Sequence, residues 1–309
     1  VAIALALGGA LFWTVKTGGF QRQARSTDET DKNENTEIAE STPSKEPTAD
    51  TASETEIPGV EVFYDLKITD VSLEPLYIEV IKDKLFAAEN SGSLYVSELE
   101  TPKFEKVPGA LYENIYELET LDEELYISSE NGVSVYNPLE EITENYKIPG
   151  QDVFYPYLSS VYQIEEDQIK KYSLADAPTS EEEASVEGAV WTQSEEISNA
   201  KDMAISISIY LLTENGEVTK YTSGTKEDFS LSGLERPLAE PVALKTKWDW
   251  DNIYILDRGN NRIVLTDKEG VFVEEFVNPA WTDLRDIAVN FEEDVLYILN
   301  GSKVYEKEL

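Results

Sequence analysis

The chain has 309 residues and a formal net charge of −37, with 62 acidic and 25 basic residues. Nucleic acid is therefore an unsuitable partner, because binding a polyanion requires Lys and Arg to displace its counterions. Cysteine and histidine are both absent, which excludes disulfides, thiolate metal sites, Cys nucleophiles and every Ser-His triad. We expect no cofactor and no enzymatic activity, although carboxylate, Lys, Tyr, Ser and Thr remain as groups that could carry chemistry.

The chain begins with an uncharged run, VAIALALGGALFWTV, followed by Lys16. Fifteen helical residues span about 22 Å, short of the roughly 20 residues that a bilayer core needs. Because residue 1 is Val1 and the single Met is Met203, we expect the missing part of the helix to lie upstream. We predict a single-pass transmembrane helix over residues 1–20, with a signal-peptide core as the alternative.

Residues 21–58 are rich in Glu, Asp, Ser, Thr and Pro and nearly devoid of large apolar side chains. Such a segment cannot bury enough apolar surface to fold, so we predict a disordered acidic linker. Lys16, Arg22 and Arg25 favour a cytoplasmic location for the chain downstream of the helix. The linker nevertheless resembles the stalks of bacterial surface proteins, and on that resemblance we expect the folded part to be extracytoplasmic.

Residues 59–309 contain short runs in which apolar and polar side chains alternate, the pattern of half-buried β-strands. Turns of one kind separate these runs, and Asn-Gly is favoured there because both residues accept a positive φ. The turns are Glu89-Asn90-Ser91-Gly92, Glu130-Asn131-Gly132, the irregular Glu165-Glu166-Asp167, Glu214-Asn215-Gly216, Asp257-Arg258-Gly259-Asn260 and Asn300-Gly301.

These turns recur at a mean spacing of 42 residues, and 251 residues accommodate six such units. A period of about 40–45 residues with several strands per unit is typical of a β-propeller. We predict an all-β, six-bladed β-propeller with four-stranded blades over residues 59–309 and an irregular third blade. The last unit offers three strands, so we expect Val60 to Tyr64 to supply its outer strand and close the ring.

The fifth unit contains the run Asp257-Arg258-Gly259-Asn260-Asn261-Arg262-Ile263 and, after it, Asp267-Lys268-Glu269-Gly270. It resembles the repeat of NHL and TolB-like six-bladed propellers. The resemblance implies the propeller fold and, across the family, mostly protein-interaction roles. It implies no catalytic residue for this chain.

Ligands of propellers bind at the face formed by the connections between blades and by the central hairpin turns. Aromatic and Arg side chains, which dominate binding hot spots, are the candidates on that face. They are Tyr112, Tyr155, Tyr157, Trp191, Arg236, Arg258, Arg262, Trp281 and Arg285. Arg258, Arg262 and Arg285 could form a positive patch for a carboxylate, or could instead pair with Asp257 and nearby carbonyl groups.

The oxygen donors Asp249, Asp251, Asn252 and Asp257 lack the spacing of a Ca²⁺ loop, so we expect a polar hairpin tip and no metal site. The innermost strands, such as Tyr77 to Ile81 and Val242 to Lys245, are expected to bring few carboxylates inward. We therefore predict a membrane-tethered, non-catalytic module, a monomeric propeller that binds a protein or glycan or serves as a sensor domain. The alternative is a carboxylate-dependent glycan hydrolase at the channel mouth.

Overall fold

A computed structural model describes residues 60–66, 73–110, 112–179, 184–192, 197 and 199–309. The transmembrane helix and the linker predicted over residues 1–58 lie outside these residues and stay predictions. Within the part that is described, no helix has the length and apolar character needed to cross a bilayer.

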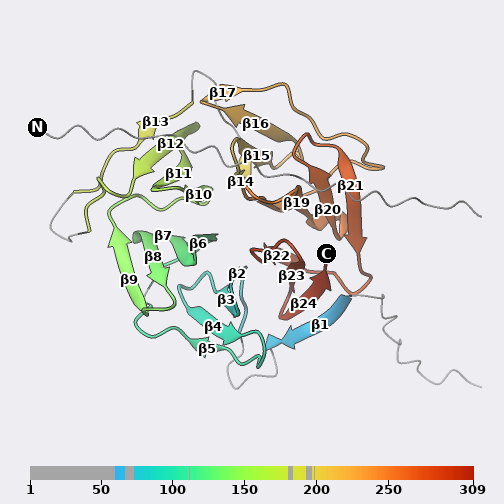
Figure 1. Cartoon of the computed structure of the whole chain (residues 1–309), viewed down its shortest axis with the longest axis horizontal. Helices are drawn as coiled ribbons and strands as arrows, with labels where there is room; N and C mark the ends of the chain where they lie inside the picture. The colour runs from blue at the N-terminus through green and yellow to red at the C-terminus, as the bar shows by residue number, and fades with distance from the viewer. Residues whose placement is uncertain (1–59, 67–72, 111, 180–183, 193–196, 198) are drawn as a thin grey trace, which may run out of the picture. The chain divides into compact units, whose positions relative to one another are not determined.

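Six four-stranded antiparallel sheets form the blades of a propeller, and Figure 1 shows them arranged in a ring. The predicted all-β fold, the number of blades and the four strands per blade are confirmed. Numbered along the chain from Tyr77, blades 1 to 6 have as their innermost strands β2 (Tyr77–Ile81), β6 (Ile115–Leu121), β10 (Phe154–Tyr157), β14 (Ala200–Ile205), β18 (Pro241–Lys245) and β22 (Leu284–Val289).

The remaining strands follow in order toward the rim. The second strands are β3 (Lys84–Ala88), β7 (Glu124–Ser129), β11 (Ser160–Glu165), β15 (Ile209–Thr213), β19 (Asn252–Asp257) and β23 (Val295–Asn300). The third strands are β4 (Leu94–Glu98), β8 (Gly132–Asn137), β12 (Gln168–Ser173), β16 (Val218–Thr222), β20 (Arg262–Asp267) and β24 (Lys303–Glu308). The outer strands are β5 (Glu105–Lys106), β9 (Ile142–Tyr146), β13 (Ala189–Val190), β17 (Thr225–Lys226), β21 (Phe272–Val277) and β1 (Val60–Asp65).

Closure of the ring occurs as predicted, because β1 pairs with β24 and completes blade 6. Val62 lies opposite Tyr305 in this pairing, and the ring of Phe63 packs edge-on against Tyr297 at 5.6 Å between centroids. Supplying the outer strand from the other end of the propeller covers an edge that would otherwise be open to intermolecular pairing.

The predicted hairpin turns connect the second and third strands of the blades, but their detailed role differs from the expectation. At the second turn only Gly132 has a positive φ, of 119°, so the turn does not need a left-handed Asn131. The Asn131 side chain instead accepts a hydrogen bond from the backbone N–H of Glu113 at 2.7 Å. The turn therefore anchors the connection that leads into the same blade.

The same device recurs in other blades. Asn300 Oδ1 accepts hydrogen bonds from the N–H groups of Thr282 and Asp283 at 3.0 and 2.8 Å. Asp257 Oδ1 accepts one from Ala239 at 2.7 Å. Backbone groups in these connections have no strand partner and must be satisfied by other acceptors, which explains the polar residue at these three hairpin turns.

Candidate functional site

The centre of the propeller contains a buried ionic cluster. Lys245 Nζ donates to Glu79 Oε1 at 2.8 Å and to Glu119 Oε1 at 2.7 Å. These three side chains come from β18, β2 and β6, and each is at most 6% exposed. The expectation that the innermost strands bring few carboxylates inward was wrong.

Pairing between the first and second strands explains how Lys245 reaches these partners. The residues at the same level of the six innermost strands are Glu79, Glu119, Tyr155, Ala204, Lys245 and Ala288. Two of the six are alanine, which leaves room for the long Lys245 side chain. Tyr155, which lies at the same level, donates its hydroxyl to the carbonyl of Thr246 at 3.0 Å.

The protonation of this cluster follows from burial and from mutual interaction. Burial raises the pKa of Glu119 well above its usual value, although Lys245 opposes this effect. Burial alone would lower the pKa of Lys245, but Glu119 and Glu79 reverse the effect and hold it well above the ordinary lysine value. Lys245 is therefore a cation at neutral pH, and Glu79 and Glu119 both accept hydrogen bonds from it.

A second group of acids lies nearer the start of the innermost strands and joins neighbouring blades. Asp202 accepts the N–H groups of Met203 at 2.7 Å and Leu244 at 2.6 Å, the latter in the next blade. Asp286 likewise accepts the N–H groups of Ile287 and Ile78, both at 2.8 Å.

Burial raises the pKa of Asp202 to about 6 and that of Asp286 to about 7. Both carboxyls thus have structural partners, and each lies beside a local irregularity in strand register.

Glu117 occupies the corresponding place in blade 2, also beside a register shift. It accepts a hydrogen bond from its neighbour Leu118 at 3.0 Å, but no described bond joins it to blade 3. Burial raises its pKa well above the usual range. Glu117 is therefore the member of this group that remains available to a ligand.

The channel opens into a cavity on each side of the cluster. We call the first the N-side mouth, because residues near the start of the innermost strands line it. Its volume is about 380 Å³. The lining comes from all six blades: Leu76, Tyr77, Tyr116, Glu117, Asp152, Lys201, Val242, Arg258 and Arg285.

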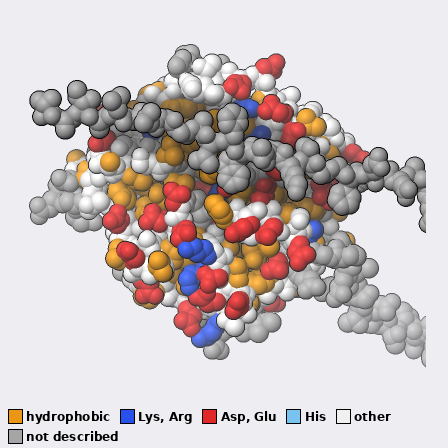
Figure 2. Space-filling view, viewed as in Figure 1, with side chains coloured by type: hydrophobic (Ala, Val, Ile, Leu, Met, Phe, Trp, Pro, Cys, Tyr) orange, Lys and Arg blue, Asp and Glu red, His pale blue; other side chains and the backbone are white. Residues whose placement is uncertain are grey.

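Three cations meet at the N-side mouth. Arg285 binds Asp283 and donates to the carbonyl of Pro75 at 3.0 Å. Lys201 and Arg258 have no side-chain hydrogen bond or ion pair to any residue that the structure describes. Unpaired cations are unexpected on so acidic a chain, and Figure 2 shows how strongly red acidic side chains outnumber blue basic ones on the visible face.

The nine sequence-predicted site residues separate into distinct environments. Arg258 and Arg285 both line the N-side mouth, whereas Lys201, which joins them, was not singled out. Arg236 is exposed, and Tyr157 and Trp191 are partly buried against the core. Tyr112, Tyr155, Arg262 and Trp281 are buried and line neither mouth.

Arg262 shows the structural alternative that the sequence left open. Its guanidinium binds Asp257 Oδ2 at 2.6 Å and Glu275 Oε2 at 2.5 Å. It also donates to the backbone carbonyls of Arg236 and Pro237 at 2.8 and 3.2 Å. Of the oxygen donors considered for a Ca²⁺ loop, Asp257 lies at the opposite end of β19 from Asn252. Within the described residues, no group of acids is placed to hold a metal ion.

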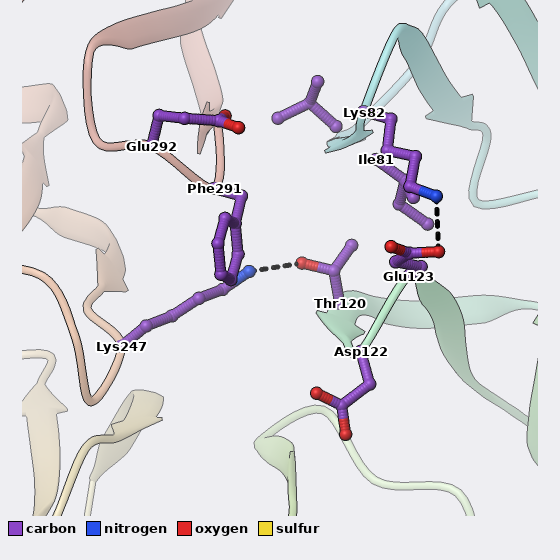
Figure 3. A pocket seen from close by; sticks show the side chains of 9 residues that line it. Ile81, Lys82, Thr120, Asp122, Glu123, Lys247, Phe291 and Glu292 are labelled. Carbon is purple, nitrogen blue, oxygen red and sulfur yellow. Dashed lines mark hydrogen bonds and ion pairs between the residues drawn. The ribbon is translucent and has the colours of Figure 1, made fainter.

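The second cavity, the C-side mouth, lies where the innermost strands end. Its volume is about 480 Å³, and Figure 3 shows the side chains around it. The lining residues are Val80, Ile81, Lys82, Thr120, Asp122, Glu123, Lys247, Phe291 and Glu292. The buried cluster of Lys245 separates the two mouths.

Comparison with known proteins supports the fold without assigning a role. No family model and no curated protein matches the sequence. Among solved structures, virginiamycin B lyase from Staphylococcus aureus aligns at 13% identity and a TM-score of 0.55, covering 81% of this chain and 99% of the lyase. A protein of unknown function from Bacteroides thetaiotaomicron aligns at 14% identity and a TM-score of 0.58, covering 81% and 75%.

PorZ, a surface component of the type-IX secretion system of Porphyromonas gingivalis, aligns at 16% identity and a TM-score of 0.54. The match covers 74% of this chain and 30% of PorZ. The structural alignments establish a shared propeller fold. Identities this low carry no information about the ligand or the chemistry.

Proposed function

We propose that this protein is a non-catalytic binding module that recognises an acidic ligand at the N-side mouth. The observation that carries the proposal is the meeting of Lys201, Arg258 and Arg285 at one cavity of a chain with a net charge of −37. Two of these cations, Lys201 and Arg258, form no side-chain hydrogen bond or ion pair with a described residue, so a ligand carboxylate could pair with them. Leu76 and Val242 add apolar surface to the same cavity.

The state of the buried acids supports binding over catalysis. A glycan hydrolase needs two carboxyl groups free to act on one bond. Glu79 and Glu119 are bound to Lys245, and Asp202 and Asp286 accept backbone N–H groups. Four of the central carboxyls therefore already have structural partners.

A hydrolase stays the second candidate because of Glu117 and Asp152. Both line the N-side mouth, and the raised pKa of Glu117 is the property expected of a general acid. On this alternative, Glu117 would protonate the leaving oxygen while Asp152 acted as base or nucleophile.

Binding can be tested with the full chain on an array of acidic and neutral glycans and with a hexaglutamate peptide in calorimetry. We expect acidic probes to bind and Arg258→Ala to weaken them by about tenfold, because a hydrogen bond to a charged group contributes about 1.5–3 kcal/mol. Arg236→Ala removes an exposed Arg outside the mouth and is the matched control. Equal losses in the two variants, or no acidic probe bound, would contradict the proposal.

The hydrolase alternative predicts a different result. Bound glycans would be cleaved by the unmodified chain, and Glu117→Gln would abolish cleavage while retaining binding. We expect binding without release of reducing ends, and sustained turnover that depends on Glu117 would replace the binding proposal with the hydrolase.

We also propose that residues 1–20 anchor the propeller to a membrane, outside the cytoplasm, and that residues 21–58 act as its spacer. The uncharged run at residues 1–15 and the acidic composition of the linker support this arrangement. Membrane fractionation and protease treatment of intact cells provide the test. Recovery in the soluble fraction, or protection of the propeller from external protease, would contradict it.

The resemblance of the Asp257–Ile263 run to NHL and TolB-like repeats supports an interaction role of the same kind. A sensor role, with a signalling part upstream of Val1, is a further form of the binding proposal. The complete reading frame tests this form, which fails if only a short leader precedes Val1.

A further inference from the structure

The C-side mouth contains an amine in an unusual setting. Lys247 follows β18, and its Nζ donates to the hydroxyl of Thr120 at 2.8 Å (Figure 3). The same Nζ lies 5.2 Å from the centre of the Trp250 ring. Although the chain has 62 acidic residues, Lys247 forms no ion pair with any described residue. Its principal hydrogen-bonding partner is therefore a neutral hydroxyl.

Burial lowers the pKa of Lys247 below the ordinary lysine value. The charged groups that face it act in both directions: Glu79, Glu119 and Asp249 favour the ammonium form, and Lys245 opposes it. Glu79 and Glu119 already accept strong hydrogen bonds from Lys245. A larger share of Lys247 is consequently the free, nucleophilic amine at neutral pH than for an exposed lysine.

The backbone around Lys247 is held in place. Lys268 Nζ donates to the carbonyl of Lys247 at 2.8 Å and to that of Trp248 at 3.2 Å. Thr246 donates its hydroxyl to the carbonyl of Asn252 at 2.8 Å. The backbone that carries the amine is therefore held in one position beside the cavity, which reduces the entropy lost when a bound molecule reacts with the amine.

The cavity in front of the amine can accept an apolar molecule. Val80, Ile81 and Phe291 supply apolar walls, and Phe291 is 63% exposed and so accessible from solvent. Figure 3 shows Glu292 pointing into the cavity, whereas Asp122 points away from it. The other amine of this mouth, Lys82, is paired with Glu123 at 2.5 Å and is 59% exposed.

We propose that Lys247 is a carbonyl-reactive amine, and that the C-side mouth binds an aldehyde or ketone with an apolar body and holds it as an imine. The lone pair of Nζ attacks the carbonyl carbon, forming the C–N bond while the carbonyl oxygen takes up a proton. The resulting carbinolamine loses its hydroxyl as water, with a proton delivered by Glu292 or solvent, and nitrogen releases its remaining excess proton. One amine and one carbonyl thus give one imine and one water, without an oxidant or reductant.

The C-side mouth shares no lining residue with the N-side mouth, so this proposal can fail without affecting the proposed function. The first test uses the unmodified chain. The full chain is incubated at about pH 7 with hexanal and cyanoborohydride, which reduces an imine to a stable secondary amine, and labelled lysines are identified by peptide mass mapping. We expect Lys247 to be labelled at least about tenfold faster than Lys82 and the exposed Lys103, because the cavity holds the aldehyde beside the amine at a high effective concentration and the lowered pKa of Lys247 enlarges its share of free amine. Its rate should also saturate with hexanal concentration.

Two variants separate a binding cavity from simple reactivity. Phe291→Ser removes an exposed wall and should raise the half-saturating hexanal concentration several-fold, with little effect on labelling by acetaldehyde, which is too small to need that wall. Lys247→Arg should remove the fast label without transferring it elsewhere, while Lys82→Arg should leave it intact. Labelling of Lys247 no faster than that of Lys103, or a rate that rises linearly with hexanal in the unmodified chain, would overturn the proposal.

Discussion

Replacing Lys245 with Met tests the buried ionic cluster most directly. Met keeps the unbranched shape of the side chain but removes the charge that binds Glu79 at 2.8 Å and Glu119 at 2.7 Å. Both carboxylates would then be buried without a counter-charge. Removing one partner from a buried ion pair costs about 3–5 kcal/mol, a large fraction of the roughly 5–15 kcal/mol that stabilises a typical domain.

The loss of stability should depend on pH, because protonation of Glu119 removes one of the two buried negative charges. Without Lys245 the folded-state pKa of Glu119, which burial already raises, moves further above its unfolded value, so the native state binds more protons than the unfolded state. Stability then falls as pH increases through that window. The variant should therefore be least impaired at about pH 5 and most impaired at about pH 8.

Urea unfolding followed by tryptophan fluorescence at the two pH values measures the loss. Lys103→Met is the matched control, because Lys103 forms an ion pair with Glu105 in which both side chains are exposed, and such pairs contribute about 0–1 kcal/mol. A Lys245→Met loss within about 1 kcal/mol of the control, or an equal loss at both pH values, would refute the assignment of the cluster.

Three further predictions concern stability and association. Arg262→Met leaves Asp257 buried without its partner and should cost about 3–5 kcal/mol in urea unfolding, whereas Arg258→Met, at an exposed position, should cost less than about 0.5 kcal/mol. Burial raises the pKa of Asp286 to about 7, so the native state keeps a proton that the unfolded state releases, and stability should fall between about pH 4 and pH 7. Asp286→Asn should flatten this slope by up to about 1.4 kcal/mol per pH unit. An unchanged slope would contradict the assignment. Removing residues 1–65 deletes β1 and exposes the edge of β24, so size-exclusion chromatography should show association. The control lacks only residues 1–52, keeps the compact unit of residues 53–309 with β1, and should elute without associating.

Repeat spacing made the blade count predictable, because each blade places one turn at the same point of its sheet. Closure by Val60 to Tyr64 followed from counting strands in the last unit, and β1 confirms it. The turn residue was predicted for an incomplete reason. At the second turn the Asn131 side chain serves as a hydrogen-bond acceptor through Oδ1, and Gly132 alone has the left-handed backbone there. Single-residue turn preferences do not reveal which distant N–H a side chain will accept.

The central acids were missed for a physical reason. Glu79 lies between Ile78 and Val80 in β2, the alternation expected of a strand with one face in water. Alternation does not distinguish a solvated face from a channel closed by a cation, and Lys245 is 166 residues away from Glu79 in sequence. Lys201 was overlooked because its neighbours at the N-side mouth come from other blades. Convergence of this kind depends on the closed ring.

The buried cluster determines how the two mouths can be related. Because Lys245, Glu79 and Glu119 are almost inaccessible to solvent, a small molecule in one mouth has no open path to the other. Any communication must pass through strands that reach both sides, such as β18, which begins beside Val242 and leads directly into Lys247. A ligand that shifted β18 at the N-side mouth would move Lys245 and, two residues further, the reactive amine. Independent mouths require that an acidic probe bound at Arg258 leave the labelling rate of Lys247 unchanged, whereas a changed rate would identify β18 as the element that couples them.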